Sequence, residues 1–140
     1  MIEMLDHTAD VGFELSAATL EDLFAEAHRA LLLVAFERPP ESGPEEREVR
    51  LSAPDRESLL VRWLNELIYL VQDAGYVPAR ARLEAREAGG GACELEAWLA
   101  GTPPLLEEYG WQGEIKSATF HGLAVRFEAG GWRARVILDV

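Results

Sequence analysis

The sequence is poor in several residue types, and each shortage excludes a class of protein. Cys93 is the single cysteine, so the chain cannot form an internal disulfide, and we expect it to work in a reducing cytoplasm. The longest apolar runs, residues 30–36 and 67–71, are too short to cross a bilayer. Acidic residues interrupt the start of the chain, so we expect neither a membrane span nor a signal peptide.

Basic residues are also scarce. The chain has 13 basic and 25 acidic side chains, which give a net charge of −12. Strong binding of nucleic acid depends on clustered lysine and arginine, and the sequence contains no such cluster. We therefore expect no direct strong nucleic-acid binding. The acidic surplus suits docking onto a basic protein, although solubility alone is an equally simple reason for it.

Lysine is the rarest basic residue. Lys116 is the only lysine, and the other basic positions are all arginine. A genome with a bias toward arginine codons, or a thermophilic origin, accounts for the general preference. Because an ammonium and a guanidinium bind their partners with different geometry, the one retained lysine is a candidate functional residue. The alternative is an ordinary charge on a strand edge, where it discourages edge pairing.

The size and patterning indicate one α+β domain spanning residues 1–140. An apolar fraction of 49% and a charged fraction of 27% are typical of globular proteins. Helices are expected after Thr19, and from Asp55 to Gly75, because apolar residues recur at helical spacing behind good N-caps. We expect a two-layer α/β sandwich, with two helices on a mostly antiparallel sheet of about six strands in the order β-α-β-α-β-β-β-β. The expected strands are 11–16, 48–52, 80–86, 93–99, 123–128 and 132–138.

Two acidic positions are candidate metal ligands. Asp10 precedes the first expected strand, and Asp139 ends the last one beside Val140. If these strands are neighbours, the two side chains and the terminal carboxylate converge, and a hard divalent cation would relieve their repulsion. Oxygen ligands favour calcium or magnesium over zinc. The alternative is a solvated chain end, with Asp10 capping loop amides.

Other candidate sites are weaker. His7 and His121 could ligate zinc with Asp10, but no close Cys/His spacing supports that set. Ser117 and His121 are four residues apart, yet no G-x-S-x-G elbow surrounds the serine. The sequence also has no P-loop and no G-x-G-x-x-G after a strand. We therefore expect a protein without a catalytic machinery of its own.

Four blocks of sequence resemble the archease family. They are Leu5–Gly12 (LDHTADVG), Asp55–Leu70 (DRESLLVRWLNELIYL), Glu114–Gly122 (EIKSATFHG) and Val136–Val140 (VILDV). The resemblance covers the whole chain and implies a protein cofactor of the tRNA-splicing RNA ligase. Such a cofactor promotes guanylylation of the ligase, allows multiple turnover and broadens its use of nucleoside triphosphates.

The resemblance also implies roles for individual residues. The metal positions of the family fall on Asp10, Asp139 and Val140, and its functional lysine falls on Lys116. Asp6, His7 and His121 are possible supporting residues. Two other functions stay open, namely a stand-alone metal-dependent phosphoesterase and a chaperone-like module for a nucleic-acid-processing enzyme.

Overall fold

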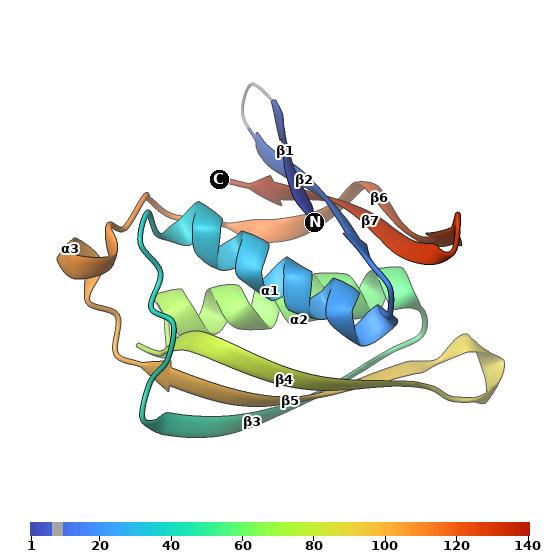
Figure 1. Cartoon of the computed structure of the whole chain (residues 1–140), viewed down its shortest axis with the longest axis horizontal. Coiled ribbons are helices and arrows are strands. Elements are labelled where there is room, and N and C mark those ends of the chain that lie inside the picture. Colours follow the sequence, from blue (N-terminus) through green and yellow to red (C-terminus); the bar gives the residue numbers. More distant parts are fainter. Residues whose placement is uncertain (7–9) are drawn as a thin grey trace.

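Two helices lie between two antiparallel sheets in the computed structural model, which describes residues 1–6 and 10–140 (Figure 1). The first sheet has four strands in the order β1-β2-β7-β6, and the second has three in the order β3-β5-β4. The α+β class predicted from the sequence is confirmed. The strands, in chain order, are β1 (Ile2–Asp6), β2 (Asp10–Ala17), β3 (Glu45–Ala53), β4 (Val77–Glu87), β5 (Cys93–Thr102), β6 (Ser117–Glu128) and β7 (Gly131–Asp139).

The helices begin at the predicted caps. Helix α1 (Leu20–Ala35) follows Thr19, whose hydroxyl accepts the Asp22 N–H at 3.1 Å. Helix α2 (Arg56–Gln72) follows Asp55, whose carboxylate accepts the Ser58 N–H at 2.7 Å. These bonds satisfy backbone donors that the first turn of a helix leaves unpaired. A short helix, α3 (Leu106–Tyr109), lies between β5 and β6.

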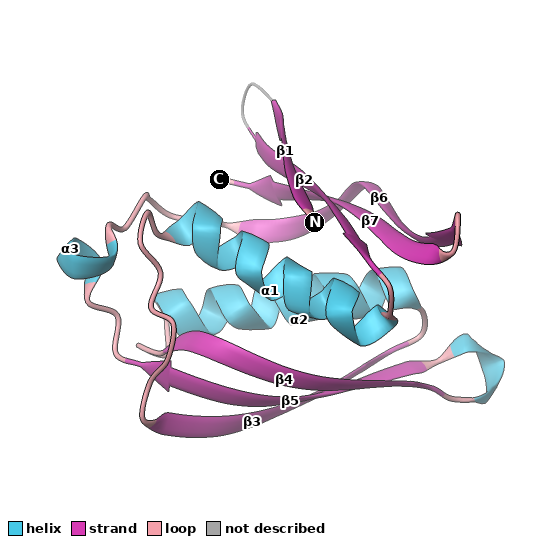
Figure 2. Ribbon diagram, in the orientation of Figure 1, coloured by secondary structure: helices cyan, strands magenta, loops and turns pink. Residues whose placement is uncertain are grey.

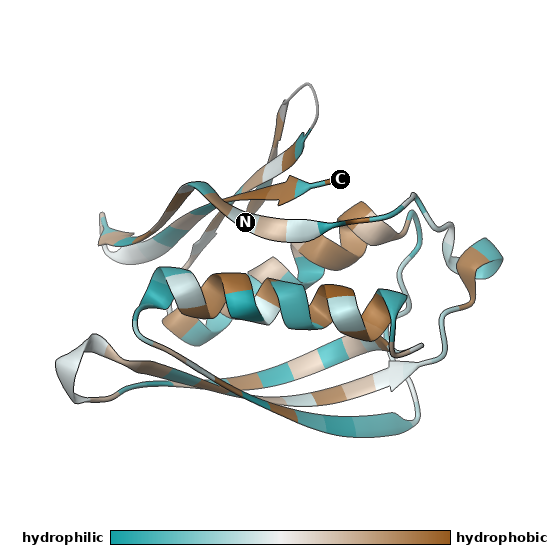
Figure 3. Cartoon of the chain, turned by 180° about the vertical axis from the view of Figure 1, so that it is seen from behind, coloured by the Kyte–Doolittle hydropathy of each residue, from teal (hydrophilic) through white to brown (hydrophobic). Residues whose placement is uncertain are grey.

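Helix α2 is the centre of the core. Trp63 is fully buried, and its indole N–H donates to the Phe24 carbonyl of α1 at 3.0 Å. The helix contacts β6 of one sheet and β3 of the other, and so it buries opposite sides (Figure 2). Seen from behind, the helices alternate hydrophobic and hydrophilic residues along their length (Figure 3).

The predicted single sheet of about six strands is wrong. Seven strands form two sheets, because helices that are apolar around so much of their girth need cover on both sides. The prediction also missed β1, a strand of only five residues. Met4 and Leu5 are adjacent apolar residues, so the alternation that indicates a strand is weak, and Met4 is half exposed. None of the helices described here is long and apolar enough to span a membrane.

Candidate functional site

The candidate metal ligands meet at one corner of the four-stranded sheet. Asp10 of β2 pairs directly with Asp139 of β7, which pairs on its other side with Ser117 of β6. Directly opposite residues of antiparallel strands share a sheet face. Val136 and Leu138 are fully buried toward the helices, so the alternating Asp139 faces outward. Two carboxylates and a hydroxyl therefore form one row on the outer face.

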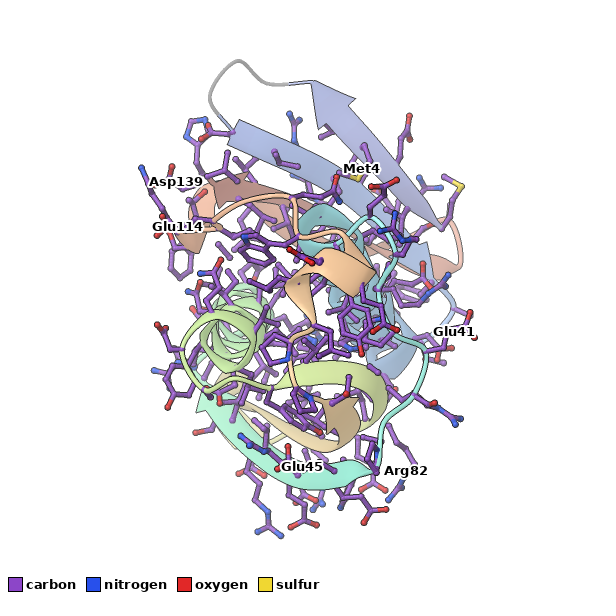
Figure 4. The ribbon with its side chains drawn as sticks, turned by 90° about the vertical axis from the view of Figure 1, so that its left-hand side faces the viewer. Met4, Glu41, Glu45, Arg82, Glu114 and Asp139 are labelled. Atoms are coloured by element: carbon purple, nitrogen blue, oxygen red, sulfur yellow. The ribbon has the colours of Figure 1, made fainter. Side chains whose placement is uncertain are left out.

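Lys116 lies beside this row. Its backbone N–H donates to the Asp139 carbonyl at 2.8 Å, directly before β6 begins, and its side chain is exposed. Figure 4 shows Glu114, from the same segment, at the corner that Asp139 occupies. The lysine that the composition singled out is thus adjacent in the fold to the acidic pair.

Helix α2 holds the lysine segment in place. The Gln72 side-chain amide donates to the Ile115 carbonyl and accepts the Ile115 N–H, each at 2.8 Å. Asn65 Oδ1 of the same helix accepts the Ala118 N–H, also at 2.8 Å. Since β6 is an edge strand, these side chains satisfy backbone groups that another strand would otherwise pair. Lys116 is fixed between two anchored residues.

The supporting residues are placed less fully. His121 is exposed on β6, where its N–H donates to the Thr119 hydroxyl at 3.3 Å, and the pairing of β6 with β7 is interrupted between Thr119 and Ala124. His7 and the side chain of Asp6 lie outside the described part of the molecule. Within residues 1–6 and 10–140, no three His, Cys, Asp or Glu side chains gather in a metal-binding group. A cation at the acidic pair would need further oxygen ligands.

His28 is a polar residue that the sequence reasoning did not consider. It is 3% exposed on α1, and its ring hydrogen-bonds to the Pro78 carbonyl at the start of β4. Burial lowers the pKa of His28, the Pro78 bond partly opposes that shift, and Arg29 adds to it. The residue joins α1 to the three-stranded sheet and lies away from the acidic corner. Helical spacing could have found it, because His28 lies four residues after Phe24 and three before Leu31 on the buried face of α1.

Cys93 has no role at the corner either. It is buried at the start of β5, in the other sheet, and its thiol contacts the Gly91 carbonyl at 3.3 Å. Burial raises the pKa of this thiol, so it is neutral at pH 7.

Comparison with known proteins decides the family. The model of the archease protein family matches residues 2–140. The chain belongs to the archease family. Protein archease of Methanosarcina mazei is 37% identical over 138 residues, which cover 99% of this chain and 94% of that protein. Protein archease of Methanothermobacter thermautotrophicus is 32% identical over 141 residues, covering 99% and 97%.

Two solved structures share this archease fold. The solution structure of Methanobacterium thermoautotrophicum protein 1598 aligns with a TM-score of 0.78 and 31% identity, covering 99% of this chain and 98% of that one. The crystal structure of a Thermotoga maritima archease, described as a possible chaperone, aligns with a TM-score of 0.64 and 24% identity, covering 100% and 98%. The second likeness concerns the fold alone.

Proposed function

We propose that this chain is an activator of the tRNA-splicing RNA ligase and is not itself an enzyme. It would promote guanylylation of the ligase, support its multiple turnover and broaden its use of nucleoside triphosphates. Membership of the archease family supports a role of this kind. The observation that carries the proposal is the position of Lys116, whose backbone is bonded to Asp139 while Asp139 pairs with Asp10.

The shape of the corner favours a partner protein over a small substrate. Among the described residues, those that line the hollows on the outer faces of the two sheets do not include Asp10, Lys116 or Asp139. An enzyme that acts alone normally surrounds its substrate with a concave site. An exposed lysine on a rigid strand end is instead suited to enter the cleft of another protein. The net charge of −12 would favour a basic mouth to that cleft.

The acidic row fits a hard divalent cation. Like charges directly opposite each other on a sheet are unfavourable, and here both groups are half-buried carboxylates. Asp10 and Asp139, with a main-chain oxygen of Val140, would hold calcium or magnesium, and the Ser117 hydroxyl is the next oxygen in the row. The cation would supply positive charge that offsets this repulsion and attracts phosphate oxygens.

The chain's own part in the mechanism is to present one ammonium group. Gln72 and Asn65 fix the backbone on either side of Lys116, so only its flexible side chain has to be ordered when the partner docks. A compact ammonium could neutralise a nucleotide phosphate or an active-site carboxylate of the ligase. A planar guanidinium would make that contact with different geometry.

Ligase turnover tests the lysine. Product per ligase molecule should fall to near the unactivated level with Lys116→Ala and should also fall with Lys116→Arg, which keeps the charge. Arg80→Ala is the matched control, because Arg80 is an exposed cation on the other sheet. All three variants should melt like the parent, as surface substitutions usually do. Full turnover with both lysine variants would refute this role for Lys116.

Calorimetry tests the cation. Asp10→Asn and Asp139→Asn should each weaken calcium or magnesium binding, and residues added after Val140 should do the same by displacing its main-chain oxygens. Glu94→Gln, an exposed carboxylate on the three-stranded sheet, serves as the control. Unchanged metal affinity in both aspartate variants would remove the cation from the proposal.

The same assays separate the alternatives. Hydrolysis of a phosphate ester by the chain alone, with metal, would indicate a phosphoesterase. A higher yield of folded ligase without more product per folded molecule would indicate a chaperone, the role suggested for the Thermotoga maritima protein. Either result would overturn the activator proposal.

A further inference from the structure

The outer face of the four-stranded sheet contains a groove that the proposed function does not use. Its volume is about 340 Å³. It lies further along the face that carries Asp139, because Arg135 is four residues from Asp139 on β7, or about 13 Å at the usual rise of a strand. Its charged lining residues are Glu3, Glu14, Arg126, Glu128, Arg133 and Arg135.

One wall of the groove brings arginines together. Arg126 of β6 lies directly opposite Arg133 of β7, and Arg135 follows on the same face of β7. Like charges in this position destabilise a sheet. Glu128 approaches Arg133 at 3.8 Å, whereas neither Arg126 nor Arg135 forms an ion pair with any of the described residues. Two guanidinium groups therefore face each other with little internal compensation.

The other wall is acidic. Glu3 of β1 lies directly opposite Glu14 of β2, which again opposes like charges. Glu14 is also the register partner of Arg135, yet the two side chains are not within ion-pair distance. Gly122, at φ +64, and Ala124 of β6 also line the groove, and their small side chains do not fill it. Cationic and anionic groups thus line opposite sides of one hollow.

A second hollow, on the three-stranded sheet, shows what compensated charges look like. It contains Arg47, Arg82, Glu46 and Glu48. Arg47 pairs with Glu45 at 3.4 Å and stacks over Tyr76, and Arg82 lies over the Trp98 ring at 4.1 Å. Arg47 and Arg82 therefore have partners within the fold, whereas Arg80, which also lines this hollow, forms no ion pair with the described residues. The arginines of the first groove have few such partners.

We propose that the first groove binds a phosphate ester that also carries hydroxyl or amino groups, the chemistry of a nucleotide. The phosphate oxygens lie between Arg126 and Arg133, with Arg135 beside them. Guanidinium groups bind phosphate through two parallel hydrogen bonds. Glu3 and Glu14 accept hydrogen bonds from the hydroxyl or amino groups. A hollow of about 340 Å³ is within the usual range of small-molecule sites, roughly 300–1,000 Å³.

Isothermal titration at low salt, with pyrophosphate and with adenosine diphosphate as probes and no added metal, tests this site. Both probes should bind the parent protein, and adenosine alone should not. Arg126→Ala and Arg133→Ala should each weaken both probes at least tenfold. Arg80→Ala, an exposed strand arginine outside the groove, should leave both affinities unchanged. Glu14→Gln should weaken the nucleotide but not pyrophosphate.

Stability separates loss of the site from loss of the fold. Because Arg126 faces Arg133, replacing it with alanine removes a repulsion, so Arg126→Ala should melt at or above the parent temperature while losing phosphate binding. Absence of binding to the parent protein would overturn the proposal. So would equal losses in the Arg80 and Arg126 variants, since such losses reflect net charge and not a site. Ligase turnover is not part of this test, so its outcome is independent of the activator proposal.

Discussion

The outer faces of the two sheets arrange their charges in opposite ways. On the three-stranded sheet, carboxylates and guanidinium groups are mostly interleaved, and where Glu84 of β4 lies directly opposite Glu96 of β5, Arg86 lies near both carboxylates. Glu96 of β5 lies 3.3 Å from Arg86 of β4 and 3.9 Å from Arg50 of β3. The Trp98 indole donates to Glu48 at 2.6 Å on the same face. On the four-stranded sheet, like charges lie directly opposite each other in the pairs Glu3 with Glu14, Asp10 with Asp139, and Arg126 with Arg133. Glu14 also lies opposite Arg135, but the two side chains are not within ion-pair distance.

This difference indicates which face of the molecule binds an external ligand. Interleaved charges compensate one another, so the three-stranded face has less need of an external partner. Opposed like charges cost stability, and departures from such local rules are expected mainly at functional or strained sites. The acidic row would accept a cation, and the arginine wall would accept an anion. The comparison can be tested by substituting residues on one face and comparing the change in stability with that of substitutions on the other face.

The largest expected effect comes from the layer that both sheets share. Trp63→Ala should lower the free energy of unfolding by about 3–5 kcal/mol, because it empties a large buried volume. Chemical denaturation measures this loss, and both faces should be lost in one transition. Trp98→Ala on the three-stranded face should cost only about 1 kcal/mol, from its contact with Arg82 and its exposed hydrogen bond to Glu48. Equal losses for the two tryptophans would mean that the helix layer is not the common core.

Gln72 should affect only the four-stranded side. Gln72→Ala leaves a part-buried N–H and carbonyl of Ile115 without partners, at a cost of about 1–3 kcal/mol. Hydrogen exchange at Ile115 and Lys116 should accelerate, while amides of β5 keep their protection. Gln112→Ala, which removes one exposed bond to the Leu33 carbonyl, is the control. Uniformly faster exchange in both sheets would contradict a local role.

His28 makes the three-stranded side sensitive to acid. Because burial lowers the pKa of His28 from 6.5, the unfolded chain binds the proton more readily than the folded protein. Stability should therefore be constant with respect to this group above pH 6.5 and should fall as the pH drops from 6.5 toward the lowered folded value. Unfolding curves of the parent and of His28→Gln, measured from pH 7 to about 5, check this. A parallel pH dependence in the two proteins would show that another group is responsible.

The smallest effect is expected on the interleaved face. Glu96→Gln removes the carboxylate that lies near Arg50 and Arg86, and should cost about 0.2–1 kcal/mol at low salt. The loss should shrink as salt is added, because screening weakens exposed pairs. Thermal unfolding at two salt concentrations measures it. Glu14→Gln on the other face should instead be neutral or slightly stabilising, since Glu14 opposes Glu3. A loss of stability for Glu14→Gln that exceeds the loss for Glu96→Gln would show that the two faces do not differ as described.

Local signals in the sequence predicted the local structure well. Thr19 and Asp55 begin their helices as the capping pattern indicated. The expected strands 80–86, 93–99, 123–128 and 132–138 lie within β4, β5, β6 and β7. Pairing of distant strands was beyond such signals, because alternation defines a strand but not its neighbour. From the sequence, Asp10 could therefore be placed beside Asp139 only on the condition that the first and last strands are neighbours. The division into two sheets was missed.

The arginine wall was within reach of the sequence. In a hairpin whose two-residue turn is Ala129 and Gly130, the register that sets Phe127 against Trp132 also sets Arg126 against Arg133. The expected strands 123–128 and 132–138 already contained both residues. By contrast, nothing local indicates that Gln72 will bond to Ile115, since that contact depends on how α2 crosses the edge of β6.

The central pairing of β2 with β7 has a consequence for how the protein forms. Asp10 and Asp139 are separated by nearly the whole chain, and the four-stranded sheet cannot close until β7 has been synthesised and inserted beside β2. Sheets built from such distant partners fold slowly, because a long loop must be ordered before the contacts that reward it are made. A chain that lacks β7 has neither the acidic corner nor the arginine wall, because both need residues of that strand. Both candidate binding sites are therefore absent from incomplete chains, which cannot engage a partner or a ligand through them.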